Sequence, residues 1–201
     1  MIVIVDYGMG NLGSIQNMLK RIGLAAIITA DLQIISDAGK IILPGVGAFD
    51  NAMTRINNSG LRDVLDHKAL VEQVPVLGIC LGMQLLTQGS EEGNLPGLGW
   101  IPATTSRFPN TPNLKVPHMG WNLVHRSTRS KITEGFEEEP RFYFVHSYYV
   151  KVENEAHSIL KTEYGVKFDS AIQNGNICGV QFHPEKSHRF GMRLLTNFAE
   201  L

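Results

Sequence analysis

The sequence predicts an α/β protein with a layered fold around a mostly parallel sheet. In the first half of the chain, short runs of β-branched apolar residues alternate with segments whose apolar residues recur at helical spacing. This alternation is typical of βαβ units, which form parallel sheets covered by helices. From Arg141 onward, predicted strands follow one another directly, which indicates an added antiparallel portion in the C-terminal half.

The elements of the first half follow from this periodicity. Strands are predicted at residues 2–5, 25–29, 40–43 and 75–79. Helices are predicted around Leu12, Ile15, Leu19 and Ile22, at residues 32–37 and at residues 61–71. Ligands of such folds bind beyond the carboxyl ends of the strands, so the loops after Val5, Leu43 and Ile79 are the expected site.

The second half opens with a stretch rich in glycine and proline, residues 90–113, which predicts loops around short strands. Strands are then predicted at residues 142–149, 158–162, 168–173 and 177–182, and a helix at residues 189–200. Asn174-Gly175 between the last two strands is a strong hairpin signal. We expect a single domain over residues 1–201, because no linker, repeat or low-complexity segment interrupts the chain.

The composition narrows the classes of partner and the compartment. A formal net charge of −1 gives no electrostatic footprint for nucleic acid or for an anionic membrane. No apolar run reaches the roughly 18 residues that a membrane span needs, and the apolar residues 2–5 end far short of a signal-peptide core. Two cysteines, Cys80 and Cys178, make no disulfide framework. We therefore expect a cytoplasmic protein.

Cys80 stands directly behind a predicted strand and in front of a short helical pattern. Gly78 and Gly82 flank it, which gives the pattern G-x-C-x-G. This is the strand–turn–helix arrangement of hydrolase nucleophiles, with cysteine in place of serine. The N–H groups at the start of a helix favour a thiolate and an oxyanion beside it. Taken alone, the pattern fits a buried core cysteine equally well, which is how we interpret Cys178.

His183-Pro184-Glu185 follows the last predicted strand. A cysteine nucleophile needs a base that takes its proton and a third group that orients the base. Proline keeps the preceding residue extended, which allows Glu185 to lie beside the imidazole of His183 and to fix its tautomer. Most His-x-Glu triplets are surface turns. In combination with G-x-C-x-G at a separate strand end, the motif predicts a triad of Cys80, His183 and Glu185.

Pro44-Gly45-Val46-Gly47 also follows a predicted strand directly. Acyl chemistry needs two N–H donors for the oxyanion, one after the nucleophile and one from a neighbouring loop. The N–H of Leu81 is the candidate for the first donor, and that of Val46 or Gly47 for the second. A glycine-rich turn without a catalytic role is the alternative for this segment by itself.

Two other kinds of site compete with this interpretation. Residues 8–13 match the G-x-G-x-x-G fingerprint of dinucleotide-binding proteins, and Asp31 stands about where a ribose-binding carboxylate is expected. Asp31 nevertheless resembles a helix N-cap, so a nucleotide-binding module stays an alternative. A zinc site is disfavoured, because no second cysteine or acidic cluster complements His183 and His188.

The motifs together resemble a known family. Residues 78–84 (GICLGMQ) with His183-Pro184-Glu185 are similar to the class I, triad-type glutamine amidotransferases. Residues 6–11 (DYGMGN), 117–122 (PHMGWN) and 143–148 (YFVHSY) narrow the resemblance to the HisH type, the glutaminase subunit of imidazole glycerol phosphate synthase. The resemblance spans essentially the whole chain. It implies a three-layer, flavodoxin-like fold and no cofactor or metal.

The resemblance also implies residue roles. Cys80 would attack the side-chain amide of glutamine, and His183, oriented by Glu185, would pass a proton to the leaving ammonia. The implied oxyanion donors are Val46, Gly47 and Leu81. The implied glutamine contacts are Gly47, Gln84, Ser147 and Tyr148. The implied partner contacts are Asn11, Met119, Trp121, Tyr143 and Lys186.

The ammonia needs an acceptor, because free ammonia protonates and escapes in water. The resemblance implies a heterodimer with a TIM-barrel cyclase of the HisF type, which makes imidazole glycerol phosphate and AICAR from PRFAR in histidine biosynthesis. Residues 187–192 and 100–102 also resemble a sister branch that feeds a sugar amidotransferase of surface-glycan synthesis. That acceptor stays an alternative, as does a cysteine peptidase-like hydrolase without a preference for glutamine.

Overall fold

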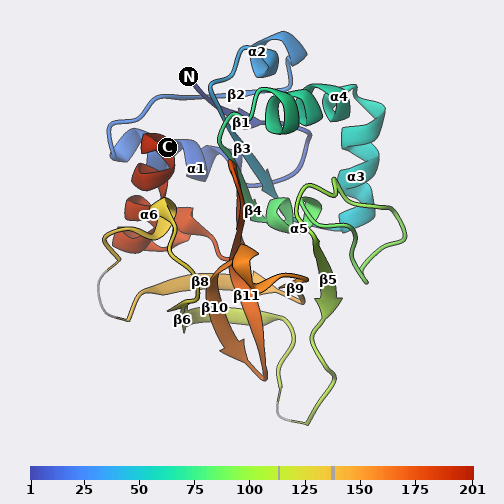
Figure 1. The fold of residues 1–201 in the computed structure, drawn as a ribbon, viewed down its shortest axis with the longest axis vertical. Coiled ribbons are helices and arrows are strands. Elements are labelled where there is room, and N and C mark those ends of the chain that lie inside the picture. Colours follow the sequence, from blue (N-terminus) through green and yellow to red (C-terminus); the bar gives the residue numbers. More distant parts are fainter. Residues whose placement is uncertain (113, 137–138) are drawn as a thin grey trace.

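A computed structural model describes residues 1–112, 114–136 and 139–201 of the chain (Figure 1). Its main sheet is parallel on one side and antiparallel on the other. The parallel side has the order β2 (Ala26–Thr29), β1 (Ile2–Val5), β3 (Lys40–Gly45), β4 (Val76–Cys80) and β12 (Ile177–Val180). The predicted α/β class with an antiparallel addition is confirmed.

The antiparallel side continues from β12 and ends in two branches (lower part of Figure 1). Its strands are β11 (Val166–Asn174), β10 (Ser158–Tyr164), β7 (His125–Arg126), β9 (Tyr148–Val152) and β5 (Ala103–Arg107). A separate ladder pairs β6 (His118–Leu123) with β8 (Arg141–His146). The predicted hairpin joins β11 and β12, with Gly175 at a positive φ of 56° in the turn.

Helices cover both faces of the parallel strands (Figure 1). One face carries α1 (Leu12–Arg21) and α6 (His188–Glu200). The other carries α2 (Leu32–Ser36), α3 (Phe49–Asn58), α4 (Leu61–Asp66) and α5 (Leu81–Leu85). Short helical turns complete the chain: η1 (His67–Val71), η2 (Lys131–Thr133), η3 (Glu155–His157) and η4 (Pro184–Lys186).

Two apolar clusters lie between the layers, one under each set of helices. Alternate residues of the strands point into different clusters: Val3 and Val5 face α3 and α4, whereas Ile2 and Ile4 face α1 and α6. This period of two is that of a strand buried on both faces. The arrangement is the three-layer fold that the resemblance implied.

The structure differs from the sequence-based prediction in several places, and strands β6 and β7 are among the elements that were not predicted. The strand expected at residues 142–149 is two strands, β8 and β9, which separate at Ser147 because they pair with different neighbours. Helix α3 was not predicted, although its buried residues Phe49, Ala52, Met53 and Ile56 have helical spacing. The helix expected at residues 61–71 changes to a π-helical turn at His67.

The position of Asp31 bears on the alternative of a nucleotide-binding module. The side chain of Asp31 accepts hydrogen bonds from the backbone N–H groups of Gln33 (2.8 Å) and Ile34 (3.1 Å), so it caps α2 as expected. Of the stretch predicted as loops around short strands, residues 90–113, the last residue, Asn113, lies outside the described part of the chain. Among the described residues, no helix combines the length and the apolar character that crossing a bilayer would require.

The turn between β4 and α5 is packed against β3 so closely that only glycine fits on either side of Cys80. A side-chain carbon on Gly82 would overlap the backbone oxygen of Leu43 in β3. One on Gly78 would lie 2.7 Å from the backbone oxygen of Gly82. The two glycines of G-x-C-x-G therefore bring strand, turn and helix into direct backbone contact.

We predict that Gly82→Ala destabilises the protein by about 1–3 kcal/mol, because β3 must move to admit the methyl group. Gly13→Ala is the matched control, since Gly13 lies exposed in α1 with open space around it. The control should leave stability unchanged or raise it by up to about 1 kcal/mol. Urea unfolding of the two variants measures the difference, and equal stabilities would contradict this account of the turn.

Candidate active site

Cys80 occupies a backbone conformation that L-residues rarely adopt. Its φ is 55° and its ψ is −109°, between the end of β4 and the first turn of α5. Such a conformation costs on the order of 1–3 kcal/mol and persists only where the surroundings enforce it. Here the glycine packing on both sides enforces it. The residue is 7% exposed, so the sulfur lies just below the surface of a cavity.

Two groups contact the sulfur of Cys80 within hydrogen-bonding range. The thiol donates to the backbone oxygen of Val145 in β8 over 3.9 Å. The side-chain Nε2 of Gln181 donates to the sulfur over 3.7 Å. These distances are typical of weak hydrogen bonds that involve sulfur, and they hold the side chain at the carboxyl end of β4.

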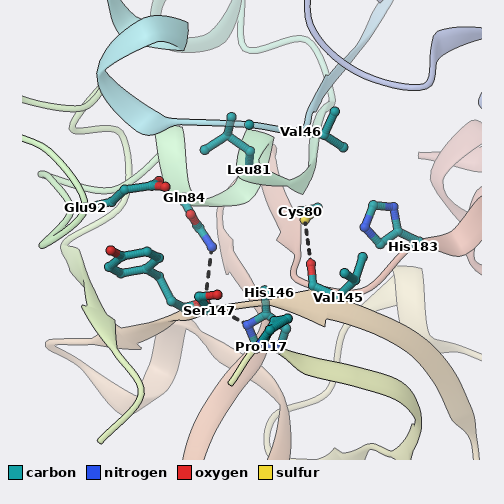
Figure 2. A pocket seen from close by; sticks show the side chains of 12 residues that line it. Val46, Cys80, Leu81, Gln84, Glu92, Pro117, Val145, His146, Ser147 and His183 are labelled. Atoms are coloured by element: carbon teal, nitrogen blue, oxygen red, sulfur yellow. Dashed lines mark hydrogen bonds between the residues drawn. The ribbon is translucent and has the colours of Figure 1, made fainter. Parts of the chain in front are cut away.

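His183 lies beside Cys80 (Figure 2). It follows β12, and its backbone is extended before Pro184, as the motif predicted. Its Nδ1 is 2.8 Å from Oε1 of Glu185, and both side chains are almost completely buried. Its Nε2 has no hydrogen-bond partner among the described residues. With Nδ1–H donated to Glu185, the neutral ring presents Nε2 as an acceptor toward the site.

The surroundings of His183 favour its protonated form. Burial by itself lowers the pKa of His183, but interactions with Cys80 and then with Glu185 outweigh burial and raise the pKa to about 10. The imidazolium can therefore persist at neutral pH once Cys80 has lost its proton. The ring can then act as an acid toward a leaving group.

A cavity of about 350 Å³ opens above the sulfur, a size that suits a small molecule. Its lining comes from six separate segments of the chain. The lining residues are Val46, Gly47, Cys80, Leu81, Gln84, Glu92, Pro117, Val145, His146, Ser147, Tyr148 and His183. Figure 2 shows His183 on one side of Cys80 and Glu92 on the opposite side.

The candidate oxyanion donors lie on one wall of this cavity. Val46 and Gly47 follow β3, and Leu81 is the first residue of α5. Gly47 has a positive φ of 108°, a backbone conformation that glycine adopts readily because it has no side chain. The hydroxyl of Tyr7 donates to the backbone oxygen of Pro44 and so fixes the start of this loop.

A family model described as "Glutamine amidotransferase class-I" matches residues 3–201. The chain belongs to the class I glutamine amidotransferases. The G-x-C-x-G turn, the His-Pro-Glu motif and the cavity between them are thus features of a member of this enzyme family.

Similar proteins and structures agree with the family. A Methanococcus maripaludis protein named "Imidazole glycerol phosphate synthase subunit HisH 2" is 56% identical over 198 residues, 98% of each chain. A Bdellovibrio bacteriovorus protein named "Imidazole glycerol phosphate synthase subunit HisH" is 48% identical over the full length of both. A crystal structure titled as a glutamine amidotransferase aligns with a TM-score of 0.76 at 19% identity, covering 100% of this chain and 98% of the other.

The expected glutamine contacts of this amidotransferase all line the cavity. Gln84 is buried, and its Nε2 donates to the backbone oxygen of Tyr148 (3.2 Å) and to Oε1 of Gln181 (3.0 Å). Since both N–H donors are used within the protein, Gln84 offers its carbonyl oxygen to a ligand. Ser147 and Tyr148 lie at the break between β8 and β9, which turns them toward the cavity.

The expected partner contacts lie on β6, on β8, on η4 and at the start of α1. Met119 and Trp121 on β6 are 62% and 47% exposed. The ring of Trp121 meets that of Tyr143 at 6.2 Å between centroids, and Nζ of Lys186 lies 5.6 Å from the Tyr143 ring. Asn11 is exposed at the start of α1. His188, which stacks on Trp121 at 5.5 Å, joins this group without having been predicted.

Sequence reasoning missed several residues of the cavity. Glu92 lies in the loop after α5, where no periodicity or motif marks it. Burial raises the pKa of its carboxyl group, a hydrogen bond from the N–H of Phe49 lowers it, and the charge of Asp50 raises it. Gln181 stands two residues before His183, and this proximity to the motif was the available signal. Among the described residues, no cluster of potential metal ligands exists.

A buried histidine pair supports the break between β8 and β9. Nδ1 of His146 lies 2.7 Å from the backbone oxygen of Tyr148, and its Nε2 lies 2.9 Å from Nδ1 of His118. Burial lowers the pKa of His146 to about 3 and that of His118 to about 4. Both rings are therefore neutral, and they fix the Tyr148 carbonyl.

We predict that Glu185→Gln lowers glutamine turnover by about 10²–10⁴-fold, because the amide no longer fixes the tautomer or the charge of His183. The alkaline limb of the pH–rate profile should move to lower pH, since the lost carboxylate had raised the pKa of His183. Glu163→Gln, on the exposed surface of β10, is the matched control. Steady-state assays across pH test this, and wild-type kcat/KM in the first variant would contradict it.

Proposed function

We propose that this chain is the glutaminase subunit of an imidazole glycerol phosphate synthase, with Cys80 as nucleophile. The observation that carries the proposal is the buried pair of His183 and Glu185, 2.8 Å apart, beside a sulfur held in a strained turn at the floor of a cavity. Membership of the class I glutamine amidotransferases supplies the reaction class. Relatives that are 45–56% identical over the full chain are named as subunits of this synthase, which supports the assignment.

In the first half of the reaction, the thiol proton of Cys80 passes to Nε2 of His183, and the sulfur bonds to the amide carbon of glutamine. The carbonyl oxygen takes up negative charge, which the N–H of Leu81 and an N–H of the Val46–Gly47 loop stabilise. The C–N bond then breaks. His183 gives its proton to the departing nitrogen, which leaves as ammonia, and a γ-glutamyl thioester remains.

In the second half, water attacks the thioester carbon and loses a proton to His183. The C–S bond breaks, glutamate leaves, and the proton returns to the sulfur. In both halves Glu185 accepts the Nδ1–H of His183 and keeps it in place, so the same Nε2 serves as base and acid in turn.

The residues at the two ends of the cavity suit the two ends of a glutamine molecule. Glu92 lies across the cavity from His183 and can pair with the ammonium group of the amino acid (Figure 2). The carbonyl of Gln84 and the Ser147–Tyr148 break offer polar groups between the two ends. A carboxylate at the far end favours a free amino acid over a peptide, whose chain has no ammonium group there. This favours glutaminase chemistry over a general peptidase.

The acceptor of the ammonia would be a separate subunit. The exposed side chains of Met119 and Trp121 form an apolar and aromatic surface with the half-buried Tyr143, and surfaces of this kind mark protein interfaces. Lys186, one residue after the catalytic Glu185, brings this surface close to the active site along the chain. We propose that a TIM-barrel cyclase binds here and receives the ammonia without its release into water.

We predict that Cys80→Ala abolishes glutamine-dependent synthesis of imidazole glycerol phosphate by the complex with the cyclase. Synthesis with added ammonium salt should continue at the wild-type rate, because the cyclase itself is unchanged. Cys178→Ala is the matched control and should keep both activities. Product formation with each nitrogen source measures the effect.

A Cys80→Ala complex that uses glutamine normally would refute the proposed nucleophile. The wild-type protein could instead release glutamate only with a sugar amidotransferase and never with the cyclase and its ribonucleotide. That result would support the glutaminase reaction but would show that the acceptor is the sugar amidotransferase of surface-glycan synthesis.

A further inference from the structure

Gln181 is a buried amide next to the nucleophile that the chemistry above does not use. Its side chain is 0% exposed, and its backbone N–H donates to the oxygen of Ser170 in β11 over 2.9 Å. It stands two residues before His183 on the segment that leaves β12. In extended backbone this spacing points two side chains to the same side, here toward Cys80.

A chain of hydrogen bonds leads through Gln181 to the sulfur. Nε2 of Gln84 donates to the backbone oxygen of Tyr148 (3.2 Å) and to Oε1 of Gln181 (3.0 Å). Nε2 of Gln181 in turn donates to Sγ of Cys80 (3.7 Å). The chain therefore joins the substrate-binding break at Tyr148, a predicted substrate contact and the nucleophile.

The direction of this chain is fixed from its far end. A backbone carbonyl can only accept, so the nitrogen of Gln84 must face Tyr148. The same nitrogen then faces Gln181, which must present its oxygen there and its nitrogen to Cys80. Rotating the amide of Gln181 by half a turn would remove its buried hydrogen bond from Gln84 and would place its oxygen against the sulfur. Both changes are unfavourable, because a buried donor loses its acceptor and two acceptors come into contact.

The far end is itself held firmly. The oxygen of Tyr148 also accepts from Nδ1 of His146 (2.7 Å), and His146 is fixed by His118. Both rings are neutral because they are buried. The fixed carbonyl of Tyr148 therefore orients the amide of Gln84, which in turn orients the amide of Gln181. The N–H of Gln181 then points at the sulfur of Cys80.

We propose that Gln181 is a further catalytic residue, whose N–H donates to the sulfur of Cys80 and stabilises the thiolate that attacks glutamine. A hydrogen bond to a charged acceptor is stronger than one to a neutral acceptor, so the contact favours ionised over neutral sulfur. A neutral amide neither gains nor loses a proton near neutral pH, so Gln181 does not compete with His183 for the thiol proton. The inference rests on the proposed function and adds a residue to its mechanism.

Alkylation of Cys80 by iodoacetamide, followed as a function of pH on the full-length protein, tests the inference without glutamine. We expect Gln181→Met, similar in shape but without a donor, to move the midpoint of alkylation upward by about one pH unit, a tenfold change in the ionisation equilibrium. Gln181→Glu should move it at least as far, because a carboxylate opposes the thiolate. In both variants kcat/KM for glutamine in the cyclase complex should fall about tenfold or more.

Gln173→Met is the matched control, since Gln173 is a partly buried amide of β11 whose side chain bonds to Ser130 and Gly175, away from the cavity. It should leave the midpoint unchanged. A merely structural role of Gln181 would lower stability without moving the midpoint, so thermal melts accompany each variant. If one substitution prevents folding, the other decides.

An unchanged midpoint in a folded Gln181 variant overturns the inference. That result leaves the proposed function intact, because the function fails only if Cys80→Ala retains glutamine-dependent synthesis. The two experiments therefore fail separately.

Discussion

The backbone contact between Gly82 and the Leu43 carbonyl is the constraint on which the site depends. It presses the start of α5 against β3 and, with Gly78, holds Cys80 at a φ of 55°. The turn lifts the sulfur to the cavity floor and brings the first N–H groups of α5 beside it. The same contact places the Val46–Gly47 loop, which leaves β3, over the sulfur. One close approach thus positions both Cys80 and its surroundings.

Two sets of buried polar side chains surround this turn. The side chains of Glu185 and His183 are almost fully buried, and the interactions of His183 with Cys80 and with Glu185 raise the pKa of His183 to about 10 in spite of burial. The sulfur of Cys80 also contacts a second set of side chains, which are neutral. These amides and imidazoles form a series of hydrogen bonds that begins at Gln181 and ends at His118. The His183–Glu185 pair is suited to proton transfer, and the neutral amides and imidazoles orient the N–H that faces the sulfur. This division explains how a buried site stays polar without burying unpaired charge.

Much of the fold could be predicted, because strands buried on both faces leave near-continuous apolar runs such as Ile2–Val5. The family resemblance and the fold class are confirmed. The break at Ser147 could not be predicted, since pairing of β8 and β9 with different strands leaves no trace in local periodicity. The motifs led to Cys80, His183 and Glu185, which the structure brings together. Glu92 and the orientation of Gln181 depend on contacts between distant segments, which a single sequence does not reveal.

The central claim is that glutamine is hydrolysed through a thioester on Cys80. Rapid acid quenching of the complex with the cyclase during turnover of isotopically labelled glutamine, followed by peptide mapping, tests it most directly. The account predicts a labelled glutamyl group on the peptide that contains Cys80 and none on the peptide that contains Cys178. Steady turnover with no label on Cys80, or with label on another side chain, would contradict it.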